Sequence, residues 1–155
     1  MSTLSDQELV IAGLFTGAVV IVTLVVSLLY YVITALGLGR MFRKAGEPAW
    51  KAWIPGYNLY ILYKRCWTAK MFWIWLALDF VCMLVNKLNS DNLILSLIVI
   101  VFGIASIVIM AKQCGRVARA YGRGIGTAVG LFFFPMIFDC ILGFGKSVYT
   151  APEEV

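Results

Sequence analysis

The chain has 155 residues, of which 62% are apolar and 14% are charged, and its formal net charge is +5. Soluble domains are about 45–50% apolar and about 25% charged, so a soluble core of this length could not bury so much apolar surface. The composition excludes an ordinary soluble domain and predicts a single transmembrane domain over residues 1–155, of the all-α polytopic class.

The same numbers argue against several functional classes. The basic residues cluster beside apolar runs, so the positive-inside bias explains the net charge and no nucleic acid is expected as a partner. The chain has no histidine, and its four cysteines form no Cys-x-x-Cys pair, so neither a metal site nor a cofactor is expected. GxSxG, P-loop and HExxH motifs are also missing, and we expect no enzymatic activity.

The first apolar run predicts a membrane span over residues 10–36. No charge occurs between Leu9 and Gly39, and about 20 apolar residues suffice to cross a bilayer. The N-terminal residues lack Lys and Arg, so this run is predicted to be an anchor rather than a cleaved signal peptide. Gly37 and Gly39 suit the end of the helix. Helix contacts are expected at a GxxxG pair in this span, Gly13 and Gly17.

A basic, aromatic segment follows over residues 40–70. Lys, Arg, Trp and Tyr side chains prefer the headgroup level of a membrane, so we expect an amphipathic interfacial segment. Pro48 and Pro55 break any long helix and predict short helical pieces. The segment is interpreted either as a simple anchor or as a docking surface for lipid or protein, with these candidates: Trp50, Trp53, Pro55, Tyr57, Asn58 and Tyr60.

Two more spans are predicted over residues 71–85 and 93–111, separated by a polar turn. The third span continues into a basic extension whose cations are spaced four, three and four residues apart, which places them on one helical face. This face is explained either by positive-inside bias or by binding of anionic lipid or an acidic partner. The four residues are Lys112, Arg116, Arg119 and Arg123.

A fourth span is predicted over residues 125–144, with a kink at Pro135. Gly126 and Gly130 form a second GxxxG pair and are expected to contact another helix. Lys and Arg number seven in residues 40–70 and four in residues 112–124, against one between the second and third spans. The positive-inside rule then predicts that both basic loops are cytoplasmic and that both termini are outside.

Two acids fall inside predicted spans, Asp79 and Asp139, and both lie near the outer face. Ionisable groups inside a membrane are costly and are candidates for function. One hypothesis is a proton- or cation-linked site, supported by Cys82 and Asn86 on the same helical face as Asp79. The alternative is that each acid is protonated, or hydrogen-bonded locally at the outer interface.

Two stretches carry a family resemblance. Residues 45–64, AGEPAWKAWIPGYNLYILYK, contain Ile54, Pro55, Tyr57, Asn58 and Tyr60 in an Ile-Pro-x-Tyr-Asn-x-Tyr pattern. This pattern resembles the signature of small bacterial multi-pass membrane proteins of unknown function. Residues 120–149 resemble the family's closing segment, although Asp139-Cys140 stands where the family more often has Tyr-Pro. The family's domain also occurs ahead of signal-peptidase-like domains. Nothing catalytic follows Tyr149, so that activity is not implied here.

The function expected from the sequence is that of a non-enzymatic accessory or assembly subunit of a larger membrane complex. It would bind anionic headgroups on the cytoplasmic side, together with a membrane-protein partner or a second copy of itself, in a bacterial plasma membrane. Two alternatives stay open: a small ion- or proton-linked transporter or channel that uses Asp79 and Asp139, and a membrane immunity protein.

Overall fold

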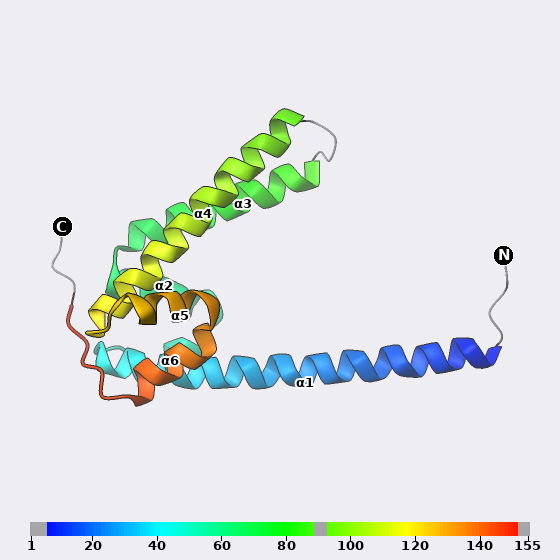
Figure 1. The fold of residues 1–155 in the computed structure, drawn as a ribbon, viewed down its shortest axis with the longest axis horizontal. Coiled ribbons are helices and arrows are strands. Elements are labelled where there is room, and N and C mark those ends of the chain that lie inside the picture. Colours follow the sequence, from blue (N-terminus) through cyan, green and yellow to red (C-terminus); the bar gives the residue numbers. More distant parts are fainter. Residues whose placement is uncertain (1–5, 89–92, 152–155) are drawn as a thin grey trace. The chain divides into compact units, whose positions relative to one another are not determined.

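The computed structural model describes residues 6–88 and 93–151, and within these ranges it contains helices and no strands. The all-α prediction is confirmed. The elements, shown in Figure 1, are α1 (Asp6–Lys44), the 3-10 helix η1 (Ala49–Trp53), α2 (Tyr57–Cys66), α3 (Ala69–Leu88), α4 (Leu93–Ala120), α5 (Ile125–Phe133) and α6 (Pro135–Phe144).

The chain divides into two compact units between Ile33 and Thr34, within α1. The described part of the first unit is a single helical segment that exposes large apolar side chains such as Val10, Leu14 and Ile21. The second unit contains the last eleven residues of α1 and all the other elements. All packing described below lies within the second unit.

Three helices are long and apolar enough to cross a membrane: Val10–Lys44, Ala69–Lys87 and Leu93–Ala120. They contain the predicted spans 10–36, 71–85 and 93–111, so the chain has the build of a membrane protein. Each helix runs past the apolar stretch into polar or basic residues. Gly37 and Gly39 therefore do not end α1, which continues to Lys44.

The fourth predicted span, over residues 125–144, is not one helix. α5 ends at Phe133 and α6 begins at Pro135, with Phe134 at φ −134° and ψ 61°, outside the helical region. At 1.5 Å per residue the two helices are only about 14 Å and 15 Å long, and neither can cross a hydrocarbon core of about 30 Å. Pro135 has no N–H and fixes φ for a first helical turn, so it starts a new helix rather than kinking an old one.

Segment 40–70 does contain short helices, as predicted. α1 is followed by a turn at Gly46, and η1 is followed by a turn at Gly56, which have φ of +75° and +79°. Only glycine adopts such angles without strain, so these two residues set the directions of η1 and α2. Pro48 and Pro55 lie in the two connections, outside the helices.

The core of the second unit forms where the end of α1 meets α2, the end of α4 and α6. Its fully buried side chains include Phe42, Ile61, Tyr121 and Leu142. The Tyr121 hydroxyl donates a hydrogen bond to the carbonyl of Met41 at 2.8 Å. Burial of each large apolar side chain contributes about 1.5–3 kcal/mol, which holds these four elements together at the basic end of α4.

α6 crosses the end of α1 at unusually close range. A Cβ on Gly37 would lie 2.9 Å from the backbone of Asp139, and a Cβ on Gly143 would overlap the carbonyl oxygen of Gly37. Lys44, the last residue of α1, donates to the carbonyls of Leu142 at 2.6 Å and Gly145 at 2.7 Å. A cation at these carbonyls satisfies the C-terminus of α6 and complements its dipole.

α5 and α6 together form a hairpin whose two ends lie at the same end of α4. α5 runs back along α4 from Ala120, and α6 returns to Lys44. The tail then pairs with that same end, because Thr150 N–H donates to the carbonyl of Ala120 at 2.7 Å and the Tyr149 hydroxyl donates to that of Arg65 at 2.7 Å. The tail therefore shares one end of the unit with Arg65 and Ala120.

Candidate functional site

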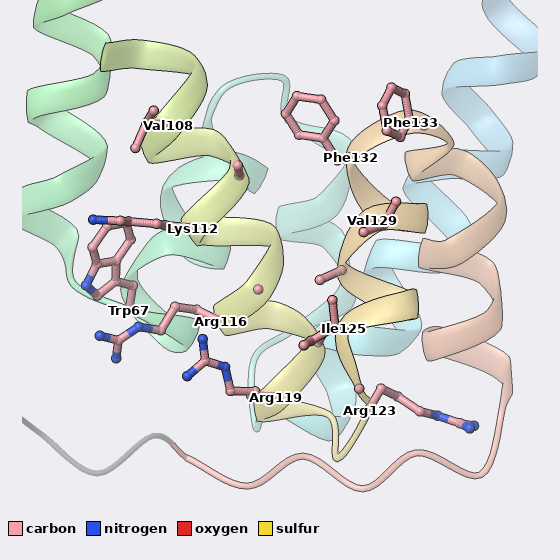
Figure 2. A pocket seen from close by; sticks show the side chains of 15 residues that line it. Trp67, Val108, Lys112, Arg116, Arg119, Arg123, Ile125, Val129, Phe132 and Phe133 are labelled. Atoms are coloured by element: carbon pink, nitrogen blue, oxygen red, sulfur yellow. The ribbon is translucent and has the colours of Figure 1, made fainter. Parts of the chain in front are cut away.

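A groove of about 990 Å³ lies between α4 and α5. The two helices run antiparallel, so Ile125 at the start of α5 lies near the end of α4, and Phe132 and Phe133 lie at the level of Val108 (Figure 2). α5 follows α4 after a connection of four residues, 121–124, in which Gly122 makes a turn with φ +66°.

The groove has an apolar end and a basic end. Val108, Val129, Phe132 and Phe133 line one end in Figure 2, and the predicted cations lie toward the other. Three of the cations, Lys112, Arg116 and Arg119, gather on the side of α4 near Trp67. The fourth, Arg123, lines the groove but directs its guanidinium the other way, toward the tail that follows α6.

Among the described residues, none that lines the groove carries a carboxylate. Arg116 places its guanidinium 5.5 Å from the ring centroid of Trp67, a cation–π contact that fixes its side chain. Among the described residues, the ion pairs are both made by Glu47, which lies outside the groove. Within the part of the chain that the structure describes, Lys112, Arg116 and Arg119 therefore form a set of positive charges without an ion-pair partner beside an apolar channel.

Glu47 holds a separate cluster under the aromatic motif. Its carboxylate is only 7% exposed and accepts hydrogen bonds from Lys51 Nζ at 2.6 Å and Arg65 Nε at 2.7 Å, with a further contact from Arg65 Nη2. These bonds connect the α1–η1 turn to η1 and α2. The sequence offered a signal for the first pair only, since Glu47 and Lys51 are four residues apart.

The aromatic motif residues lie on the surface that this cluster supports. Trp50 is 58% exposed and Trp53 44% exposed, and Pro55 and Tyr57 are also exposed. Tyr60 is half-buried, stacks on Tyr57 at 5.8 Å and meets Phe72 edge to face at 5.5 Å. Asn58 is half-buried and directs its amide toward the carbonyl of Ala52 at 3.4 Å.

The two acids have separate surroundings. Asp79 of α3 accepts a hydrogen bond from Ser106 of α4 at 2.6 Å. Asp139 is 5% exposed and its backbone lies against Gly37 of α1. No hydrogen bond or ion pair between described residues joins Asp79 to Asp139. Cys82 directs its thiol toward the carbonyl of Val99 at 3.8 Å, and Asn86 is exposed near the end of α3.

Sequence reasoning overlooked a buried amide on α4. Gln113 is 4% exposed, and neither its Oε1 nor its Nε2 has a hydrogen-bond partner among the described residues. The residue follows Lys112 directly but lies on the buried face of the helix. Within residues 6–88 and 93–151, no three His, Cys, Asp or Glu side chains gather in a way that could hold a metal ion.

The glycines that were predicted to contact other helices differ in how closely they are packed. A Cβ on Gly13, Gly17 or Gly126 would have no atom within 4 Å, so contacts of these three residues with another chain stay a prediction. Gly130 is packed tightly, against the ring of Phe138 across the α5–α6 corner. The closest helix crossing instead uses Gly37 and Gly143, whose spacing in sequence gives no local signal.

Comparison with known proteins gives one match. No curated protein and no solved structure matches the chain. A family of unknown function, DUF5684, matches residues 50–152, which include η1, the aromatic motif, the α4–α5 groove and the tail. This stretch is well over half of the chain, and it overlaps the region in which the sequence resembles a family without an assigned activity. The chain belongs to this family of unknown function, DUF5684.

Proposed function

We propose that this protein is a non-enzymatic integral membrane protein that serves as an accessory subunit of a larger membrane complex. It docks through the aromatic surface formed by Trp50, Trp53 and Tyr57 on η1 and the start of α2. The observation that carries the proposal is that these exposed side chains stand on a firmly braced backbone.

The bracing has three parts. Glu47 joins Lys51 to Arg65 beneath the surface. Ala52 is fully buried, and a Cβ on Gly39 of α1 would be 3.8 Å from the Ala52 Cβ. A simple headgroup anchor needs aromatic composition but no fixed arrangement. A protein-binding surface benefits from one, because side chains held in place lose less entropy on binding, and Trp and Tyr often dominate such interfaces.

Transport through a shared carboxylate site gains no support from this geometry. Asp79 is bonded to Ser106 between α3 and α4, and Asp139 packs between α6 and α1. The immunity hypothesis likewise has no structural feature in its favour. The accessory role therefore remains the best supported of the three.

We place the basic end of the second unit in the cytoplasm of a bacterium, since Lys and Arg concentrate there. With three crossings, by α1, α3 and α4, the N-terminus is outside and the tail is cytoplasmic. The tail's hydrogen bonds to Arg65 and Ala120 support this placement.

The docking role is tested by recovering partners from native membranes in mild detergent. Trp50→Ala with Trp53→Ala is compared with Phe80→Ala, a control because Phe80 is an exposed aromatic residue of α3 outside the aromatic motif. We expect the double variant to recover about thirtyfold less of a stoichiometric membrane partner, the loss of about 2 kcal/mol typical of an aromatic hot spot. Unchanged recovery, or an equal loss with Phe80→Ala, would reduce the segment to an anchor.

A further inference from the structure

We propose that the α4–α5 groove holds one anionic phospholipid. Its phosphate lies among Lys112, Arg116 and Arg119, and one acyl chain lies along Val108, Val129 and Phe132. This site is separate from the aromatic docking surface on η1 and α2, so it stands whether or not that surface binds a partner.

The groove has the dimensions of one leaflet. Val108 and Arg119 are eleven residues apart on α4, which corresponds to about 16 Å along the helix. Half of a hydrocarbon core of about 30 Å is about 15 Å. A lipid chain that starts at the cations would therefore end near Val108 and Phe133, at the mouth of the α5–α6 corner (Figure 2).

The charges favour an anion. Lys112, Arg116 and Arg119 occupy one helical face at spacings of four and three residues, where like charges repel one another. No carboxylate of residues 6–88 or 93–151 lines the groove to relieve this repulsion. A phosphate would relieve it, and arginine matches phosphate geometry with two parallel hydrogen bonds. Trp67 already holds the Arg116 guanidinium in place, so less side-chain entropy is lost on binding.

The start of α5 makes a smaller contribution to phosphate binding. Gly124 and Ile125 line the basic end of the groove, and Gly124 gives the helix no side-chain cap. The positive end of the α5 dipole therefore faces the position that the phosphate would occupy.

The apolar end selects a lipid over an acidic protein segment. Val108 belongs to a helix that is long and apolar enough to cross a membrane, and it stands twelve residues before the end of that helix. An acidic peptide in water could reach the cations but would have no reason to enter beside Val108, Phe132 and Phe133. A phospholipid satisfies both ends at once.

The test uses the full chain, purified in neutral detergent and stripped of lipid. Dioleoyl phosphatidylglycerol and dioleoyl phosphatidylcholine are titrated, and bound lipid is counted by native mass spectrometry. We expect one phosphatidylglycerol per chain, bound about tenfold or more tightly than phosphatidylcholine. Arg116→Gln with Arg119→Gln should weaken the binding of phosphatidylglycerol about 25-fold, which is about fivefold for each charge removed. Arg43→Gln is the control for the loss of one positive charge outside the groove, because Arg43 is exposed on α1 and does not line the groove.

A second variant tests the acyl-chain end without removing a cation. Val129→Trp fills the groove at an exposed position, so folding is preserved. It should reduce phosphatidylglycerol binding about tenfold or more, while leaving the weak binding of glycerol phosphate unchanged. The proposal is overturned if the two lipids bind equally or if Arg43→Gln weakens binding as much as the double variant does. It is also overturned if Val129→Trp has no effect, or if glycerol phosphate or an acidic peptide competes as well as the lipid.

Discussion

At the scale of single residues, Glu47 has the greatest structural influence. It joins the α1–η1 turn to Lys51 and Arg65, and so supports the surface that carries Trp50 and Trp53. Its pKa is lowered from the ordinary value, first by the hydrogen bond from Lys51 and then by the bond and charge of Arg65, although burial opposes the shift.

Replacing this acid should make stability less sensitive to acid. A carboxyl with a lowered pKa in the folded state stabilises the protein above its unfolded pKa of about 4.3, and this contribution is lost as pH falls through the folded pKa. We expect Glu47→Gln to lower the free energy of unfolding by about 1–2 kcal/mol at pH 7. Below about pH 4 the two proteins should converge.

Unfolding in detergent between pH 3 and about pH 7 measures both effects. The control is Lys51→Met, made alone and together with Glu47→Gln. If Glu47 acts through its ion pairs, Lys51→Met destabilises the parent chain but adds little to Glu47→Gln. A constant difference at every pH would mean that Glu47 acts through packing and not through its charge.

Cys66 should be chemically inert in the folded protein. Its side chain is 1% exposed in α2, and burial raises the pKa of the thiol to about 12. Reaction with a maleimide requires access and thiolate, and both are suppressed here. In a chain that keeps Cys66 as its sole cysteine, labelling at pH 8 should be about a hundredfold slower in mild detergent than after denaturation in dodecyl sulfate. Equal rates would show that α2 does not stay packed on α1 and α4.

At the scale of elements, the α1–α6 crossing depends on two glycines. A Cβ on Gly143 would overlap the carbonyl oxygen of Gly37, and both atoms belong to backbone that cannot easily move. We expect Gly143→Ala to destabilise the folded protein by about 1–3 kcal/mol, the usual cost of overpacking. Gly13→Ala is the matched control, because a Cβ there meets nothing within 4 Å.

Thermal unfolding in detergent compares the two alanine variants. A stabilised or unchanged Gly143→Ala protein would indicate that α6 does not cross α1 closely. A loss at Gly13→Ala equal to that at Gly143→Ala would point to a contact of the first unit that is made outside this chain.

The elements also show which features can be read from sequence. Long apolar runs are a local signal, and they located α1, α3 and α4 correctly. The role of Gly37 could not be found in this way, because it depends on Gly143, which lies far along the chain. Pro135 was predicted to kink a single fourth span, whereas it begins a separate helix; whether a proline gives a kink or a corner depends on packing against α1 and α4.

The candidate lipid site also combines residues that the sequence predicts with residues that only the fold brings together. The cations Lys112, Arg116 and Arg119 follow from helical spacing alone. Their apolar counterparts come from Phe132 and Phe133, which the sequence assigned to the interior of a fourth span. Only the antiparallel return of α5 along α4 brings the two sets into one groove. Trp67 enters the site from a third element, the α2–α3 connection, which no local pattern indicated.

At the scale of the whole molecule, the number of crossings decides where the tail lies. Three crossings place the two termini on opposite sides, whereas a fourth would return the tail to the outside. The tail's hydrogen bonds to Ala120 and Arg65 favour three crossings, because they hold the tail at the basic end of the second unit.

Single-cysteine variants in an otherwise cysteine-free chain test this arrangement with a membrane-impermeant maleimide on intact cells. Val148→Cys is suitable because that residue is 74% exposed on the tail. We expect Val148→Cys and Lys51→Cys to be protected from the reagent and Asn86→Cys to react. Labelling of Val148→Cys together with Asn86→Cys would indicate a fourth crossing, and labelling of Lys51→Cys would indicate the opposite orientation in the membrane.

The α5–α6 hairpin also bears on biogenesis. The described hairpin enters and leaves at the same end of α4, so in the proposed three-crossing topology residues 121–151 would not have to be translocated across the bilayer. In that topology only the N-terminal residues and the connection between α3 and α4 would pass through, and Lys87 is the sole Lys or Arg near either of them. The energetically demanding part of insertion would then be complete once α4 is in place. The hairpin would fold afterwards on the side of the membrane where the chain is synthesised.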